Sequence, residues 1–187
     1  DEADNIADLL RRLNHVLAAS GIGFELIVVD DDSPDSTWRV AANLTDEIPG
    51  LVVLRRKEAI GLATAVIDGW SYARGRLLGA IDGDGQHPPE VVTELLASIR
   101  DGADVAVASR HLDQGGMVGW SAARRLFSRG AQTLGQLLLP GTVGRVTDPM
   151  SGYFLVRRDV VAATQLDPVG YKILLEVLAR CEVRALV

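Results

Sequence analysis

Short runs of apolar residues alternate along the chain with segments whose apolar residues recur at helical spacing. The apolar runs are rich in β-branched residues and predict buried strands over residues 25–30, 51–55, 76–82 and 104–110. The segments between them predict helices within residues 32–48, 62–75 and 88–102, and a further helix opens the chain over residues 1–20. This alternation predicts a three-layer α/β sandwich with a mostly parallel central sheet.

The alternation stops after residue 110. A Gly-rich loop (111–121), a helix (122–140), a second loop (142–152), a strand (153–158) and a last helix (169–181) follow. The chain ends on CEVRALV, which reads as the start of a strand, and its first helix has no strand before it. We therefore expect one catalytic domain over residues 1–187 that is truncated at both ends and lacks its first strand.

Composition narrows the class of protein. A chain of 187 residues fits one domain, and 48% hydrophobic with 24% charged residues is ordinary for a globular protein. No segment approaches the roughly 18 consecutive apolar residues of a membrane span. The net charge of -6 argues against a general nucleic-acid binder. Between Val105 and Thr147, however, one acid stands among several arginines, which indicates a local anionic partner: Arg110, Arg124, Arg125, Arg129 and Arg145.

Two acidic clusters follow predicted strands. Asp30-Asp31-Asp32-Ser33 comes after the first strand and Asp82-Gly83-Asp84 after the third. Ligands of open parallel sheets bind outside the carboxyl ends of the strands, so neighbouring strands would gather these carboxylates in one crevice. Such carboxylates repel one another unless a cation neutralises them. Aspartates together with the Gln86 carbonyl suit Mg²⁺ or Mn²⁺ bound jointly with substrate phosphates.

Simpler interpretations stay open for both clusters. Asp32 or Ser33 could cap the following helix, and D-x-D could be a solvated turn. A calcium loop is excluded because His87 and Pro88 interrupt its pattern. The chain also lacks G-x-x-x-x-G-K-[ST] and a G-x-G-x-x-G after a strand. Phosphates would then be bound by metal and arginine, which points to a sugar-nucleotide enzyme.

Seven segments carry a family resemblance. They are VVDDDSPDST, GLATA, IDGDGQHPPE, ASRHLDQGGMVGW, RRLFSRGA, TDPMSGYFLVRR and GYKILLE. Their order resembles family 2 glycosyltransferases, and the segments look most like the dolichol-phosphate mannose synthase branch and its bacterial polyprenyl-phosphate relatives. The similarity covers nearly the whole chain. Ala63 departs from the family's G-L-G-T-A and is comfortable only at negative φ.

The resemblance implies a GT-A (Rossmann-like) fold that uses Mg²⁺ or Mn²⁺ and inverts the anomeric centre of the sugar. It assigns the nucleoside to Asp30 and Asp31, with Ser33 beside them. The metal and the donor diphosphate go to Asp82, Asp84 and Gln86, with Lys172 near the phosphates. It gives the acceptor phosphate to Arg110 and Arg124, and the sugar or acceptor side to Asp148. The predicted catalytic residues are accordingly Asp84, Arg110, Arg124 and Asp148.

We expect transfer of mannose from GDP-mannose to a polyprenyl or dolichyl monophosphate at the cytoplasmic face of a membrane, with the enzyme peripheral or tethered there. Three alternatives stay open: UDP-glucose or another UDP-sugar as donor, a non-catalytic metal- or sugar-binding module, and an Asp-nucleophile phosphatase. The last requires Thr or Val where Gln86 stands. The helical segment 120–139 fits either a core position or a bilayer surface. The sequence indicates no oligomeric state.

Overall fold

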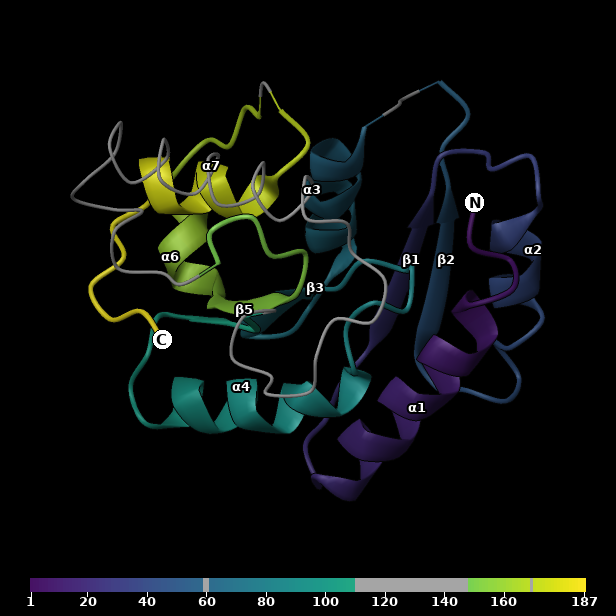
Figure 1. Cartoon of the computed structure of the whole chain (residues 1–187), viewed down its shortest axis with the longest axis horizontal. Helices are drawn as coiled ribbons and strands as arrows, with labels where there is room; N and C mark the ends of the chain where they lie inside the picture. Colours follow the sequence, from purple (N-terminus) through teal and green to yellow (C-terminus); the bar gives the residue numbers. More distant parts are fainter. Residues whose placement is uncertain (59–60, 110–147, 169) are drawn as a thin grey trace, which may run out of the picture.

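The structure, a computed structural model, describes residues 1–58, 61–109, 148–168 and 170–187. Figure 1 shows strands flanked by helices. The strands are β1 (Leu26–Asp30), β2 (Leu51–Arg55), β3 (Leu77–Ala80), β4 (Val105–Val107) and β5 (Phe154–Arg157). The helices are α1 (Ile6–Ala19), α2 (Thr37–Ala42), α3 (Leu62–Tyr72), the 3₁₀ turn η1 (Pro89–Val91), α4 (Val92–Arg100), α6 (Arg158–Ala162) and α7 (Ile173–Arg180).

The strands form two groups. β1 and β2 are parallel, with Leu26 opposite Leu51. β5 lies between β3 and β4 and is antiparallel to both, so β3 and β4 run in the same direction. The end of the chain joins β4 through a parallel bridge between Val105 and Leu186, where a strand was expected to start. The predicted α/β architecture is confirmed, but β5 makes the sheet less uniformly parallel than the sequence suggests.

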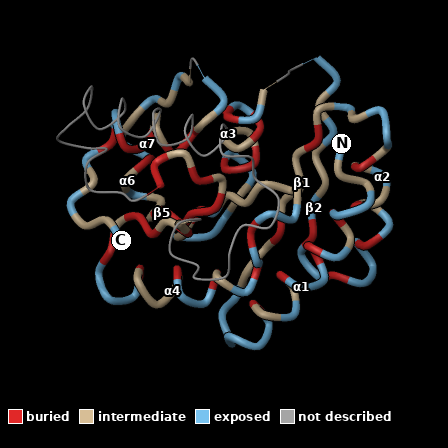
Figure 2. Tube along the Cα trace, in the orientation of Figure 1, coloured by how far each residue is buried: buried red, intermediate tan, exposed pale blue. Residues whose placement is uncertain are grey.

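Side chains of β5 alternate between two hydrophobic cores, one on each face of its sheet. Leu155 packs into the core that contains residues of α1 and α4. Phe154 and Val156, both fully buried, pack into the core that contains residues of α3 and α7. Figure 2 shows buried residues around β5 and on the inner sides of the helices, whereas β1 and β2 are mostly of intermediate burial or exposed. Helices therefore cover both faces of the sheet, which is the predicted three-layer arrangement.

Helix α1 joins the two strand groups. The apolar residues predicted to recur at helical spacing are buried: Ile6, Leu9, Leu10, Leu13 and Leu17. α1 packs against α2 on one side and against η1 and α4 on the other. Burying each leucine stabilises the fold by about 1.5–3 kcal/mol, whereas an exposed ion pair such as Arg12–Glu90 is screened by water and contributes little. Apolar packing therefore holds α1 in place.

Helix α3 approaches β1 closely because Gly69 has no side chain. A Cβ at this position would lie 3.1 Å from Cγ2 of Val29. The contact brings the helix onto the face of β1 that α1 does not cover, since Leu26 and Val28 face the α1 core. As a result, the first turn of α3 lies near the carboxyl end of β1.

Other elements differ between the prediction and the structure in where they begin and end. The helix expected over residues 88–102 begins as η1, with Pro89 in its first turn, and ends before Gly102, whose φ of +110° favours glycine. Helix α6 was not predicted. The loops and the helix expected between residues 110 and 147 lie outside the described residues. Within the described ranges, none of the helices has the length and apolar character needed to cross a membrane.

The free energy of unfolding should decrease in acid, because protonation of Glu25 removes a stabilising carboxylate. Its carboxylate accepts hydrogen bonds from the backbone N–H groups of Arg74 and Gly75 at 2.6 and 3.1 Å, and the first of these is the main cause of its lowered pKa. A carboxyl whose pKa is lowered on folding stabilises above its ordinary value of 4.5, and this contribution is lost as pH falls below it.

We therefore expect the urea midpoint to decrease from pH 6 to pH 3, and to decrease less in Glu25→Gln. Glu47→Gln removes an exposed carboxylate whose pKa is lowered mainly by a hydrogen bond from Arg11, so it serves as the comparison and should flatten the pH profile less. Identical profiles for Glu25→Gln and the parent protein would contradict the assignment.

Candidate functional site

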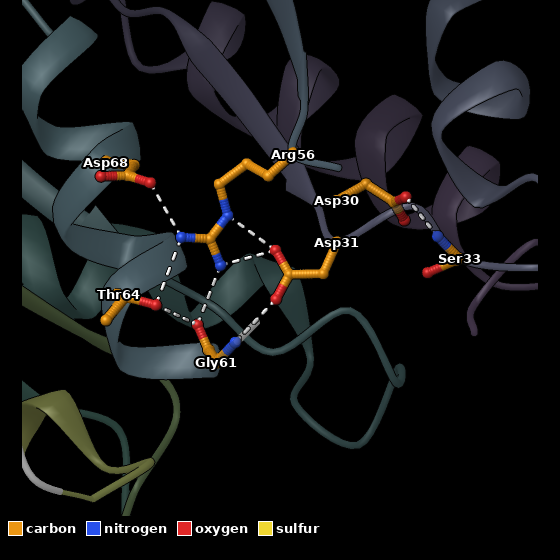
Figure 3. Close-up of polar contacts among 7 residues, drawn as sticks. All are labelled: Asp30, Asp31, Ser33, Arg56, Gly61, Thr64 and Asp68. Atoms are coloured by element: carbon orange, nitrogen blue, oxygen red, sulfur yellow. Dashed lines mark hydrogen bonds and ion pairs between the residues drawn. The ribbon is translucent and has the colours of Figure 1, made fainter. Parts of the chain in front are cut away.

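The acidic cluster after β1 splits into three different environments. Asp30 is buried, and its Oδ1 accepts a hydrogen bond from the backbone N–H of Ser33 at 2.8 Å, so it shapes the local turn. Asp32 has a φ of +57° and forms an ion pair with Arg55. Asp31 points toward Arg56 and the start of α3 (Figure 3). The capping interpretation of Asp32 and Ser33 is wrong, because the residue before α2 is Ser36, whose side chain makes no capping hydrogen bond. The local turn accounts for Asp30 and leaves Asp31 for another role.

Arg56 organises this corner of the molecule. Its Nε donates to Oδ1 of Asp31 at 2.6 Å, and its Nη1 donates to Oδ2 of Asp68 at 2.8 Å. Its Nη2 donates to the carbonyl oxygen of Gly61 at 3.0 Å. Only 9% of the Arg56 side chain is exposed, whereas half of the Asp68 side chain is exposed, so water reaches the Asp68 end of the network. These bonds fasten the end of β1, the loop after β2 and the first turns of α3 to one another.

Gly61 completes the network through its backbone. Its N–H donates to Oδ2 of Asp31 at 2.8 Å, while its carbonyl accepts from Arg56 and from Oγ1 of Thr64. Gly61 has a φ of +144°, a conformation that favours glycine. Ala63, which replaces a glycine of the family motif, lies inside α3 without a positive φ, so the conformation it requires is met.

The electrostatics of the network favour a fixed cation. Burial has the largest influence on Arg56 and would lower its pKa, but hydrogen bonds to Asp68 and Asp31 outweigh burial and the pKa is raised. Asp31 keeps a quarter of its side chain exposed. A carboxylate whose position is set by an arginine and a backbone N–H, and which still faces solvent, can accept hydrogen bonds from a ligand.

The second acidic cluster follows β3. The carboxylate of Asp82 lies 3.6 Å from Nζ of Lys172, the residue before α7, and 26% of the Asp82 side chain is exposed. Oδ1 of Asp84 accepts a hydrogen bond from the backbone N–H of Gln86 at 3.0 Å, and Gln86 itself is exposed. His87 is buried with its ring edge-on to Tyr153. The charged groups of this loop therefore face outward and the imidazole faces the core.

The donor chemistry of this loop fits a divalent ion that shares its ligands with a substrate. Two carboxylates and an amide oxygen are the hard oxygen ligands that Mg²⁺ and Mn²⁺ take. Among the described residues, no three acidic, His or Cys side chains converge on one point. β1 and β3 are also not paired with each other, so the crevice of four carboxylates expected from neighbouring strands is not formed by direct pairing. A Mg²⁺ ion bound by few protein groups completes its coordination with water and substrate phosphate oxygens.

A third segment, residues 148–153, lies against the second cluster. Asp148 is buried, and its backbone carbonyl accepts from Ser151 N–H at 3.1 Å. The Ser151 hydroxyl donates to the carbonyl of Ala108 at 2.7 Å, and the Tyr153 hydroxyl donates to the carbonyl of Pro89 at 2.8 Å. Burial raises the pKa of Tyr153 well above its ordinary value, so the phenol stays protonated as a donor. The predicted acceptor residues Arg110 and Arg124 lie outside the described residues.

Two residues of this region were not identified from the sequence. Arg56 directly follows a predicted strand, so a search of strand ends for basic as well as acidic residues would have found it. Gly152 stands beside Asp82, and a glycine inside a polar loop motif is a signal for close backbone approach. Neither signal predicts which residue Arg56 or Gly152 contacts, because both contacts join segments that are far apart in the sequence.

Comparisons with known proteins identify the family of the chain. The sequence pattern described as Glycosyl transferase family 2 matches residues 2–162. The chain is 41% identical, over 96% of its length, to the dolichol-phosphate mannosyltransferase of Pyrococcus furiosus, of which it covers 50%. It is 32% identical over 92% of its length to the polyprenol monophosphomannose synthase of Mycolicibacterium smegmatis, covering 64% of that protein. It is 33% identical over 92% of its length to the undecaprenyl-phosphate mannosyltransferase of Micrococcus luteus, covering 69%. The chain thus spans half to about two thirds of these relatives.

A solved structure has the same fold. The crystal structure of glucosyl-3-phosphoglycerate synthase from Mycobacterium tuberculosis, in complex with uridine diphosphate, matches with a TM-score of 0.66. The match covers 95% of this chain and 60% of the other at 22% identity. It supports the predicted GT-A arrangement of the strands and helices. With the sequence pattern matching most of its length and relatives above 30% identity, the chain belongs to glycosyl transferase family 2.

Proposed function

We propose that this chain is the catalytic domain of an inverting glycosyltransferase that moves mannose from GDP-mannose to a polyprenyl or dolichyl monophosphate. One observation carries the proposal: three relatives whose names specify mannose transfer or synthesis on lipid phosphates align with more than nine-tenths of the chain. The polar groups at the carboxyl ends of β1 and β3 supply the chemistry that this reaction needs.

The nucleoside is assigned to the loop after β1. Asp31 is held by Arg56 and Gly61, and its exposed part can accept hydrogen bonds from N–H or O–H groups of a base or ribose. Asp30 and Ser33 form the turn that presents it. Because the carboxylate is already oriented by the protein, little side-chain freedom is lost when the nucleotide binds.

The donor diphosphate is assigned to the loop after β3. Asp82, Asp84 and Gln86 would hold Mg²⁺ or Mn²⁺ there. When bound, the ion supplies positive charge that stabilises the departing nucleoside diphosphate. Lys172 places an ammonium group 3.6 Å from Asp82 and can bring a second positive charge to the same phosphates.

The acceptor is a phosphate monoester, which reaches the site already ionised because its second pKa is near about 6. It therefore needs orientation more than a base, a role that we assign to Arg110 and Arg124. A phosphate oxygen attacks C1 of the sugar, the bond from C1 to the diphosphate oxygen breaks, and the diphosphate leaves with the electron pair. The configuration at C1 inverts. Asp148 lines the sugar or acceptor side. Because the acceptor is a lipid, the reaction would take place at a membrane surface, and we propose the cytoplasmic face.

The proposal is tested by incubating the protein with a polyprenyl phosphate, Mn²⁺ and radiolabelled GDP-mannose or UDP-glucose, and by counting the label extracted into organic solvent. We expect label from GDP-mannose, none with EDTA, and none when the polyprenol lacks its phosphate. Label from UDP-glucose alone would correct the donor. Metal-dependent GDP binding without label from either donor would refute the lipid-phosphate acceptor and favour the non-catalytic alternative.

A further inference from the structure

We infer that Gly152 is a positioning residue that sets the orientation of the Asp82 carboxylate, and that only a glycine can do so at this position. The catalytic role of this contact rests on the proposed function, in which Asp82 binds the metal and the diphosphate. Its structural part, the contact between residues 152 and 82, stands on the geometry alone.

The contact is unusually close. A Cβ built on Gly152 would lie 2.6 Å from Oδ1 of Asp82, and the Oδ2 and Cγ atoms would be closer still. Real Cβ atoms do not approach other heavy atoms within 3.0 Å, so any side chain at residue 152 requires Asp82 to move. The φ of Gly152 is not in the left-handed region, which means that alanine fits the backbone. A side chain at residue 152 would therefore displace the Asp82 carboxylate, which is the end of a short side chain and can rotate away, and the local backbone conformation imposes no further requirement.

The segment that carries Gly152 has little room to yield. On one side of Gly152, the Ser151 hydroxyl donates to the carbonyl of Ala108 beyond the end of β4, and only 1% of Ser151 is exposed. On the other side, the Tyr153 hydroxyl donates to the carbonyl of Pro89 at 2.8 Å, and Tyr153 is 2% exposed. A buried residue that is hydrogen-bonded on each side of the glycine resists displacement. Strain at residue 152 is therefore expected to move Asp82.

The loop after β3 is held by the same segment at a second point. The buried ring of His87 meets the ring of Tyr153 edge-on, with centroids 5.7 Å apart. Residues 152 and 153 thus contact the start and the end of the loop that contains Asp84. Lys172 approaches Asp82 as a third element, from the residue before α7. The Asp82 carboxylate is consequently oriented by segments that follow it by about 70 and 90 residues.

The first test compares Gly152→Ala with Gly23→Ala. The control adds the same methyl group at an exposed glycine outside the proposed site, where a Cβ would meet no atom within 4 Å. We expect Gly152→Ala to weaken Mn²⁺-dependent GDP binding in calorimetry by about tenfold or more, the size typical of losing support for a metal ligand. Gly23→Ala should bind within about twofold of the parent protein. Equal losses in the two variants, or no loss in Gly152→Ala, would overturn the inference.

The second test needs no ligand. Gly152→Ala should lower the urea midpoint because the methyl group and the carboxylate compete for one space. Adding Asp82→Ala removes the carboxylate, so the double variant should regain the midpoint of Asp82→Ala alone. If Gly152→Ala does not fold, the double variant still should, and a midpoint in the double variant equal to the sum of the two single effects would refute the contact.

These tests separate the inference from the proposed function. Rescue of stability in the double variant, together with absence of sugar transfer by the parent protein, would support the role of Gly152 and reject the proposed reaction. Sugar transfer by the parent and by Gly152→Ala at the same kcat and with the same Mn²⁺ requirement would support the reaction and reject the role of Gly152.

Discussion

Asp84→Ala is expected to lower kcat for sugar transfer by at least about 10²-fold with the fold intact. Asp84 lies on an exposed turn of the loop after β3, where its carboxylate makes one local hydrogen bond, to the backbone N–H of Gln86. Little apolar packing is lost on truncation, so the unfolding midpoint should change little. The loss of activity would then report the missing charge beside the proposed ion.

Asp84→Asn separates charge from shape. The amide oxygen of asparagine can still accept the hydrogen bond from Gln86 N–H, so the turn is kept while the negative charge is removed. We expect Asp84→Asn to lose nearly as much kcat as Asp84→Ala. The control, Asp101→Asn, changes an exposed aspartate just after α4 and should retain normal turnover. Normal turnover in Asp84→Asn would show that the negative charge of Asp84 is not needed, which would contradict its proposed role of neutralising the ion.

Arg56→Ala is expected to affect both stability and nucleotide affinity. It removes the cation that Asp31 and Asp68 share and leaves the carbonyl of Gly61 without its guanidinium donor. Losing hydrogen bonds from a charged, largely buried partner costs about 1–3 kcal/mol of unfolding free energy. The lower half of this range applies, because Asp68 is half-exposed and water replaces part of the interaction. Without its fixed position, Asp31 should bind GDP about tenfold more weakly.

Arg55→Ala is the matched control for Arg56. Arg55 is the preceding residue, carries the same charge and also pairs with an aspartate, Asp32, but a third of its side chain is exposed. Its removal should cost at most about 1 kcal/mol and leave GDP affinity nearly unchanged. Calorimetry with GDP and urea denaturation of both variants check the comparison. If the two variants weakened GDP binding equally, net charge and not the network around Asp31 would be responsible.

Local patterns were sufficient to predict most of the fold. The leucine spacing of α1, the five residues of β2 and the proline-initiated turn before α4 were predicted where the structure has them, because each depends on neighbours in sequence. The direction of β5 could not be predicted. An apolar run such as Phe154–Arg157 fits a buried strand in either direction, and its insertion between β3 and β4 is decided by tertiary packing.

The candidate site was predicted less completely. The sequence predicted that acidic residues would lie in the loops after β1 and β3. It did not predict that consecutive aspartates would have different contacts: Asp30 supports a turn, and Asp31 joins a hydrogen-bond network. Which of two adjacent carboxylates points outward depends on Arg56 and Gly61, about 25 and 30 residues away. A one-dimensional pattern contains no information on such pairings. The metal ligands Asp82, Asp84 and Gln86 remain a prediction.

Helix α1 determines more than stability. It packs beside α2 near the parallel strand pair and beside η1 and α4 near the antiparallel group, so it sets the spacing between the loop of Asp31 and the loop of Asp82. A substitution that tilted α1 would leave each loop intact but change the distance between the proposed nucleoside and diphosphate contacts. Such a variant would bind GDP and Mn²⁺ separately and still fail to transfer sugar, because misalignment of about 1 Å can cost 10²-fold in rate. Searches for inactive variants should therefore include the buried face of a helix that contributes no ligand.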